Sequence, residues 1–158
     1  MYERPNKDRY YLDIADAVCQ RSTCLRRMYG AVIVNRDEIV STGYNGAPRG
    51  VMNCTECYRV AHNIPRGTGY NMCYSVHAEQ NAIISAPRVK MMGAILYLAG
   101  REYGSFAPIE NPDCCTTCKK MIINAGIAEV VFACGNDIKI VNVQRDWVSH
   151  PEKLIGGY

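Results

Sequence analysis

The stretch His77-Ala-Glu-Gln-Asn-Ala-Ile-Ile84 places a histidine and a glutamate immediately before a short apolar run. A second stretch, Cys115-Thr-Thr-Cys-Lys-Lys-Met-Ile-Ile123, repeats this arrangement with two cysteines ahead of its apolar residues. Each stretch is predicted to open an amphipathic helix. At a helix start, free N–H groups and the positive end of the helix dipole favour anionic sulfur, which helps keep Cys115 and Cys118 deprotonated.

The side chains at these two helix starts suit a tetrahedral zinc ion. One histidine and two thiolates leave the fourth coordination position free for water, as in catalytic zinc sites. Cys118 shares a helix face with Cys115 because it lies three residues later. Glu79 lies two residues after His77, so its side chain points in a different direction from the histidine ligand. It stays within one helical turn of the metal, where it could move the protons of the bound water. The sequence therefore predicts His77, Cys115 and Cys118 as zinc ligands and Glu79 as the catalytic acid and base.

The pattern His-x-Glu followed by Cys-x-x-Cys resembles the signature of zinc-dependent nucleobase deaminases. Five runs make the chain most similar to the deoxycytidylate (dCMP) deaminases of the cytidine deaminase-like superfamily, and the resemblance covers roughly residues 8 to 135. These runs are Arg21-Ser-Thr-Cys-Leu-Arg26, Gly30-Ala-Val-Ile-Val34, Gly43-Tyr-Asn-Gly-Ala-Pro48, His77-Ala-Glu-Gln-Asn-Ala-Ile83 and Ile122-Ile-Asn-Ala-Gly-Ile127.

This resemblance implies an α/β fold with three α/β/α layers and a mixed sheet of roughly five strands. It also implies zinc-dependent hydrolysis of dCMP to dUMP and ammonia. Members of the family assemble as homo-oligomers, often hexamers, and some relatives respond to dCTP and dTTP as effectors; Mg²⁺ could accompany such a nucleotide effector. The sequence leaves open whether dCMP, CMP, dCTP or free cytidine is the preferred substrate.

One position departs from the family pattern. The family usually has proline directly before the first cysteine of Cys-x-x-Cys, whereas this chain reads Asn111-Pro-Asp-Cys-Cys-Thr-Thr-Cys118. A shifted ligand pair, Cys114 with Cys118, is therefore conceivable. The pair Cys115 and Cys118 is favoured because a gap of two residues is the common zinc spacing and the helix then begins directly afterwards.

The composition is that of an ordinary globular protein. The chain has 158 residues, a net charge of +3 and 21% charged residues, which suits a single domain over residues 1–158. Its basic residues are scattered, so a nucleic-acid partner is not expected. No run approaches the roughly 18 to 20 apolar residues of a membrane span, and the polar N-terminal residues lack the apolar core of a signal peptide. We therefore expect a cytoplasmic protein that acts on a small-molecule nucleotide.

Periodicity indicates where the main elements lie. Residues 8–22 have helical spacing, and β-branched runs around a charged turn predict an antiparallel hairpin over residues 31–44. The segment 99–114 is longer than in many relatives and could shape the pocket or form a plain surface loop. Further strands are expected at residues 93–98, 128–133 and 138–143. The first two of these should be parallel, because a helix connects them.

Residues 45–76 are rich in Gly, Pro, Asn and Cys, and a loop of this length requires something to organise it. Four cysteines in or near the loop could form a closed structural zinc site: Cys24, Cys54, Cys57 and Cys73. The family resemblance supports a second, structural zinc, with His62 as the substitute for Cys57. The competing interpretation is that these are free thiols packed as small hydrophobic groups.

Four residues are candidates for substrate contacts. The backbone at Ala78 could bond the ring edge, and Asn45 in Gly43-Tyr-Asn-Gly46 resembles a superfamily asparagine that bonds the sugar hydroxyl. An ordinary turn is the alternative for this run, and an effector contact is a further role implied by the resemblance. Arg26 and Arg49 are candidates for the substrate phosphate, by charge and position.

A competing function belongs to a different class. A catalytically silent zinc-binding or redox module would let Cys115 and Cys118 cycle between dithiol and disulfide. Such a thioredoxin-like motif should have no His-x-Glu partner, so His77 and Glu79 argue against it. Zinc content and ammonia release distinguish the two functions.

Overall fold

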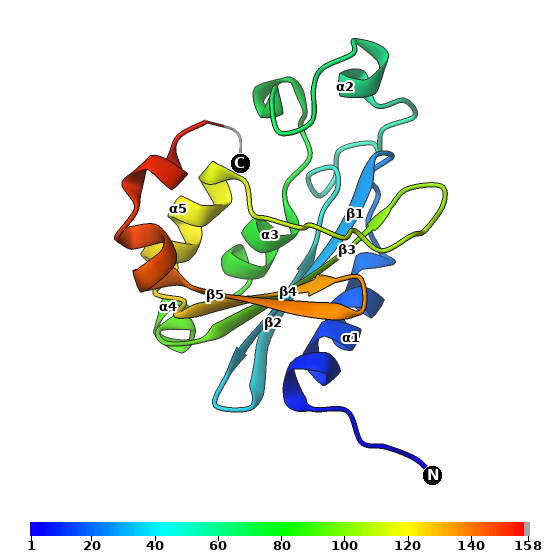
Figure 1. Cartoon of the computed structure of the whole chain (residues 1–158). Coiled ribbons are helices and arrows are strands. Elements are labelled where there is room, and N and C mark those ends of the chain that lie inside the picture. The colour runs from blue at the N-terminus through cyan, green and yellow to red at the C-terminus, as the bar shows by residue number, and fades with distance from the viewer. Residues whose placement is uncertain (157–158) are drawn as a thin grey trace.

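The computed structural model describes residues 1–156 and contains a five-stranded sheet in the order β2-β1-β3-β4-β5 (Figure 1). The strands are β1 (Arg27–Asn35), β2 (Glu38–Tyr44), β3 (Ile95–Glu102), β4 (Glu129–Cys134) and β5 (Asp137–Asn142). β3 and β4 run parallel, whereas the other neighbouring pairs are antiparallel. The predicted mixed sheet is thus confirmed, together with its parallel pair.

Helices cover both faces of the sheet (Figure 1). On one face, α1 (Lys7–Cys19) buries Leu12 and Ala15 against the sheet, where they join the cluster of Val32 and Tyr97. On the other face lie α3 (Ala78–Ile84) and α5 (Thr116–Ala125). The remaining helical turns are short: α2 (Tyr58–Ala61), α4 (Arg88–Met91), Tyr70–Met72, Gln144–Val148 and Pro151–Leu154. The three-layer α/β/α architecture is confirmed.

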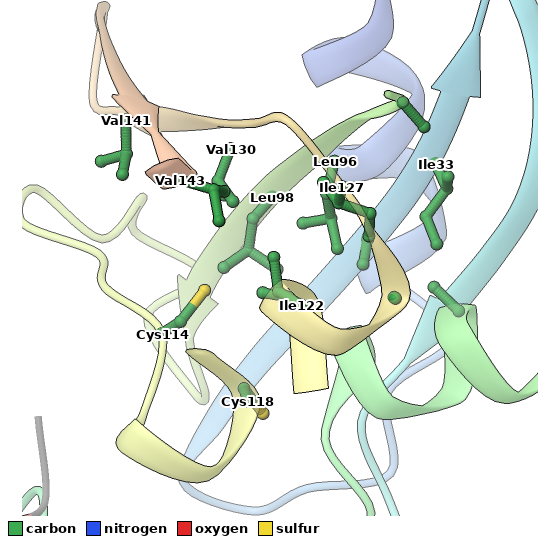
Figure 2. Packing of buried hydrophobic residues seen from close by; sticks show 14 of the residues in the cluster. Ile33, Leu96, Leu98, Cys114, Cys118, Ile122, Ile127, Val130, Val141 and Val143 are labelled. Atoms are coloured by element: carbon green, nitrogen blue, oxygen red, sulfur yellow. The ribbon is translucent and has the colours of Figure 1, made fainter. Parts of the chain in front are cut away.

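The larger core lies between the sheet and the two helices that carry the candidate site. Figure 2 shows Ile122 of α5 among sheet residues that include Leu98 and Val130, and all three are fully buried. Cys114 and Cys118 belong to the same cluster. The start of α5 is therefore fixed by packing, and the cysteines there have little freedom to move.

Gly43 allows α3 to lie directly against β2. A Cβ atom at this position would collide with the carbonyl oxygen of Ala78 and the amide nitrogen of Ala82, both on the backbone of α3. The Ser41 hydroxyl donates a hydrogen bond to the Ala82 carbonyl at 2.7 Å and holds the same helix. Because α3 begins immediately after His77, this contact sets the position of that histidine relative to the sheet.

The strands extend further than their β-branched residues predict. β1 begins at Arg27, four residues before the predicted hairpin, because Arg27 to Gly30 pair with Glu102 to Ala99 of β3. The first part of the segment 99–114 is accordingly a strand. Arg101, at the end of β3, pairs with Asp16 of α1 at 2.6 Å. The later part of this segment is a loop, and it buries Ile109, Pro112 and Cys114.

The segment 45–76 leaves the sheet and returns to it at one point, and it projects at the top of Figure 1. Its ends are joined by two backbone hydrogen bonds, from Gly46 N to Val76 O at 3.1 Å and from Val76 N to Gly46 O at 2.8 Å. This bridge ties the base of the loop to the chain immediately before His77. None of the described helices is both long enough and apolar enough to cross a membrane.

Candidate active site

The structure brings two helix starts together. His77 is the N-cap of α3, and Cys115 is the N-cap of α5, where its sulfur accepts a hydrogen bond from the Cys118 amide at 3.4 Å. The Gln80 side chain accepts from the His77 amide at 2.8 Å and fixes the other helix start. Both caps use side chains to satisfy free N–H groups, so the local sequence itself sets the approach of the three side chains.

His77, Cys115 and Cys118 form a compact cluster. The Nδ1 atom of His77 lies 3.4 Å from each of the two sulfur atoms, and the three ligand atoms all lie within 4.8 Å of one another. Ligand atoms around a tetrahedral zinc ion are separated by about 3.3 to 3.8 Å, given the usual zinc–sulfur and zinc–nitrogen bond lengths. The donor set and its spacing therefore fit zinc. Among residues 1–156, this is the single group of three or more histidine, cysteine or acidic residues with such spacing.

The hydrogen bond between the two thiols moves their pKa values in opposite directions. The hydrogen bond with Cys118 lowers the pKa of Cys115 to about 4, with a further contribution from His77. The same Cys115–Cys118 hydrogen bond, with burial, raises the pKa of Cys118. Although burial opposes protonation of His77, the hydrogen bond to Cys115 raises the pKa of that imidazole. A divalent cation bound by these three residues would displace their protons, because metal ligands must be deprotonated.

Glu79 lies beside this cluster and is 5% exposed. Burial raises the pKa of its carboxyl group. Cys114 is a neighbour of Glu79, and burial raises the pKa of the Cys114 thiol well above its ordinary value. Figure 2 shows Cys114 in the core with Leu98 and Ile122. The cluster with His77 contains Cys115 rather than Cys114, so the shifted ligand pair is not the one that the structure assembles.

A pocket of about 670 Å³, counting the space at its open mouth, ends at His77, Glu79 and Cys115. Ala78 and Asn45 also line it. Asn45 Oδ1 accepts from the Ser22 hydroxyl at 2.7 Å and from the Tyr29 amide at 2.8 Å. Asn45 Nδ2 donates to the Arg27 carbonyl at 2.8 Å. Both acceptor positions of the amide are thus used within the protein, and one Nδ2 hydrogen remains for a ligand.

The two arginines that the sequence suggested for phosphate lie in different places. Arg26 lines the pocket with His77 and Glu79. Arg49 instead lines a separate hollow between the 45–76 loop and α3. Sequence reasoning missed Arg59 and Arg66, which enter the pocket from the loop. Both lie in the cysteine-rich segment 45–76, where no periodicity indicates which way a side chain faces. Nothing in the sequence beyond their positive charge could assign them to the pocket.

The four loop cysteines line one common pocket beside α2. Burial raises the pKa of the Cys24 thiol, and the nearby Cys73 and Cys57 add to this shift. Among the described residues, no three of the four sulfurs lie within 4.8 Å of one another. The structure therefore brings Cys24, Cys54, Cys57 and Cys73 to one place but not to ligand distance. His62 is not in this pocket and stacks on Tyr58 at 3.8 Å between ring centroids.

Three comparisons with known proteins agree with this geometry. Residues 5–134 match the family model for the cytidine and deoxycytidylate deaminase zinc-binding region. The deoxycytidylate deaminase of Mycobacterium phage D29 is 37% identical over 134 residues, which cover 82% of this chain and 95% of the phage protein. The Schizosaccharomyces pombe deoxycytidylate deaminase is 36% identical over 132 residues, but this chain spans 37% of that longer protein.

A solved structure is also similar. The dCMP deaminase of cyanophage S-TIM5, crystallised in complex with dCMP and dUMP, has a TM-score of 0.59 and 27% sequence identity, and the match covers 83% of each chain. The family model spans most of this chain and includes both helix starts. This chain therefore belongs to the cytidine and deoxycytidylate deaminase family.

Proposed function

We propose that this protein hydrolyses the C4–N bond of dCMP and releases dUMP and ammonia. The observation that carries the proposal is the buried carboxyl group of Glu79 beside the His77, Cys115 and Cys118 cluster, at the end of an open pocket. The deoxycytidylate deaminases that match most of this chain support dCMP as the substrate. The reaction makes the protein a hydrolase that acts on a cyclic amidine.

The chemistry follows from the residues at the end of the pocket. A zinc ion held by His77, Cys115 and Cys118 would supply an acidified water molecule. Glu79 accepts a proton from that water and delivers it to N3 of the cytosine ring, which makes C4 electrophilic. The water oxygen bonds to C4 as a hydroxyl group. Glu79 then accepts the proton of this hydroxyl and donates it to the amine, so that ammonia leaves as the C4–N bond breaks and the C4 carbonyl of uracil forms. Burial raises the pKa of Glu79, which suits a group that accepts and then donates a proton.

Two further groups would orient the nucleotide. The backbone at Ala78 lines the end of the pocket and would bond the edge of the base. The remaining Nδ2 hydrogen of Asn45 would donate to the sugar hydroxyl. Because Asn45 is held by Ser22 and Tyr29, it needs little ordering when the ligand binds.

Replacement of Glu79 tests the proposal. Glu79→Gln keeps the shape of the side chain but removes its ability to shuttle protons, so kcat on dCMP should fall about a thousandfold while zinc content stays unchanged. Ammonia release measures the rate, and metal analysis measures the zinc. Glu38→Gln, at an exposed position on β2, is the matched control. Turnover by Glu79→Gln within tenfold of the unsubstituted protein would contradict the assignment.

The choice among cytosine compounds is tested with the same assay. We expect dCMP to be turned over with a higher kcat/KM than CMP, dCTP, deoxycytidine or cytidine. A preference for a free nucleoside would leave the reaction in place but would change the substrate class. Absence of ammonia release from every compound, in protein that binds zinc, would instead favour the non-catalytic zinc-binding module.

We also propose the finer properties that the family resemblance implies. The protein would be a cytoplasmic homo-oligomer, with six subunits as the expected number. It would respond to dCTP and dTTP, with Mg²⁺ accompanying the nucleotide effector. A second, structural zinc would bind Cys24, Cys54, Cys57 and Cys73, and their shared pocket supports this. Zinc binding would have to draw these four sulfurs closer together.

A further inference from the structure

The loop 45–76, which carries α2 (Figure 1), forms one wall of the pocket but has no core of its own. Several of its residues line the pocket: Arg59, Arg66, Gly67 and Tyr70. Within the stretch 51–76, Gly67 is the single buried residue. The bridge between Gly46 and Val76 fixes the base of the loop. The position of its far part therefore depends on a few polar contacts with the rest of the chain.

The middle of the loop contains a tight turn, Pro65 to Thr68, which we call the tip turn. The amide and the hydroxyl of Thr68 both donate to the Pro65 carbonyl, at 3.4 and 2.9 Å. The Pro65 ring restricts its own backbone, and Gly67 has a φ of +78°, a conformation that favours glycine. The tip turn is therefore a small preformed unit that packs against the protein as one piece.

The tip turn contacts the sheet through Arg66. Arg66 Nη1 lies 3.2 Å from Oε1 of Glu102, the last residue of β3. A second contact is made just before the turn, where Arg26 Nη2 donates to the Ile64 carbonyl at 3.4 Å. This second bond is long and its acceptor is neutral, so the ion pair is the stronger of the two contacts.

The sheet holds Glu102 independently of the loop. Arg27 faces it on the neighbouring strand β1, and Arg27 Nε and Nη2 lie 3.0 and 2.8 Å from the same Oε1 atom. Although burial opposes it, the hydrogen bond from Arg27 lowers the pKa of Glu102, so this carboxyl group is ionised. The Glu102 side chain is 28% exposed, whereas that of Arg66 is 58% exposed. A fixed carboxylate on the sheet thus offers a preformed acceptor to an exposed arginine of the loop.

We propose that Glu102 is a positioning residue, which holds the tip turn against the sheet and so keeps the loop wall of the pocket closed around the substrate. Among the described residues, Glu102 is not one of those that line the pocket, so it acts through Arg66. The kinetic consequence rests on the proposed deaminase function, whereas the closure of the loop does not.

An effect of charge alone has the opposite sign. The pocket wall carries several guanidinium groups, so removal of a nearby carboxylate would by charge alone strengthen the binding of an anionic nucleotide. Loss of the contact with Arg66 instead releases the loop wall, which weakens binding. Glu102→Gln therefore separates the two roles by the direction in which KM changes.

Steady-state kinetics on dCMP give the first test, with Glu102→Gln, Arg66→Gln and the double variant. Each single variant should raise KM about two- to fivefold, the range for a partly exposed ion pair, and should keep kcat within about twofold. The double variant should match the single variants, because all three lack the same contact. Glu110→Gln, at an exposed position further along the same segment, is the matched control and should leave KM unchanged.

Proteolysis measures the opening of the loop without any substrate. Trypsin must bind the side chain of the arginine after which it cleaves, and the Arg59 guanidinium donates to the Thr68 carbonyl at 2.6 Å inside the closed loop. Cleavage after Arg59 therefore requires the loop to open. In zinc-loaded protein this cleavage, followed by mass spectrometry, should be about two- to fivefold faster in Glu102→Gln and Arg66→Gln than in the unsubstituted protein or Glu110→Gln.

A KM that falls or stays unchanged in Glu102→Gln would overturn the proposal, as would effects that multiply in the double variant. Unchanged cleavage after Arg59 in both single variants counts against it equally. If Glu102→Gln folds poorly, Arg66→Gln supplies both measurements, since its side chain is largely exposed. Failure of the deaminase function is distinguishable: the unsubstituted protein would then release no ammonia from dCMP, while proteolysis would still report whether Glu102 holds the loop.

Discussion

At the scale of single residues, Cys114 and Cys115 are both buried in one cluster but differ in what their sulfur atoms contact. The Cys115 sulfur lies 3.4 Å from His77 Nδ1 and caps α5, whereas Cys114 is fully buried in the hydrophobic core. The sequence alone offers both as partners for Cys118, and spacing favours Cys115. Spacing does not explain why Cys115 faces His77 and Cys114 does not. The explanation is the packing at the start of α5, which places the Cys114 side chain in the core.

Two alanine variants separate these surroundings. Cys115→Ala removes a ligand and should abolish both deaminase activity and binding of the catalytic zinc. Cys114→Ala should keep that zinc and lose about 1 kcal/mol of stability, because it leaves only a small cavity. Metal analysis after dialysis and urea unfolding measure the two effects. Loss of the catalytic zinc in Cys114→Ala with retention in Cys115→Ala would mean that the shifted pair binds the metal.

At the scale of elements, local pattern located the strands but not their full lengths. The β-branched residues between Ala31 and Val34 predict β1, and in the structure all four side chains of this run are buried. Arg27 and Tyr29 carry no such pattern, and they are in the strand because β3 pairs with them. Arg59 could not be assigned to the pocket for a related reason. The loop that carries it is positioned by contacts distant in sequence, such as the Gly46 and Val76 bridge.

The contact between α3 and β2 leads to a prediction at this scale. Gly43→Ala would drive a methyl group into the backbone of α3, so we expect it to destabilise the protein by about 1 to 3 kcal/mol. It should also lower activity, because α3 carries Glu79 and follows His77. Thr42→Ala, at the exposed neighbouring position, is the control and should change stability by less than about 0.5 kcal/mol. Thermal unfolding and ammonia release give the two readouts. An unchanged melting temperature in Gly43→Ala would show that the helix can shift without cost.

At the scale of the whole molecule, the site joins segments that are far apart in the chain. His77 and Cys115 begin helices on one face of the sheet, Arg26 directly precedes β1, and Arg59 is carried by a loop without a core of its own. The order of the strands could be predicted only by resemblance, since it depends on the long connection from β2 to β3, which places β3 beside β1. A metal bound at the two helix starts would therefore link elements that are otherwise held together only by packing.

Removal of metal should destabilise the chain in two separable steps. A ligand that binds only the folded protein stabilises it by about 4 kcal/mol when its free concentration is a thousandfold above Kd, which corresponds to roughly 10 °C in Tm for a chain of this size. A chelator should lower the Tm of the unsubstituted protein by at least this amount.

Two variants separate the contributions of the two zinc ions. His77→Ala should abolish the part of the Tm change that is due to the catalytic zinc, and Cys57→Ser the part that is due to the loop zinc. In each variant, the zinc content should fall from two ions per chain to one. If Cys57→Ser keeps the zinc content and the chelator response of the unsubstituted protein, the loop cysteines are packed thiols and the loop is held by its own contacts, including the Arg66 and Glu102 ion pair at 3.2 Å.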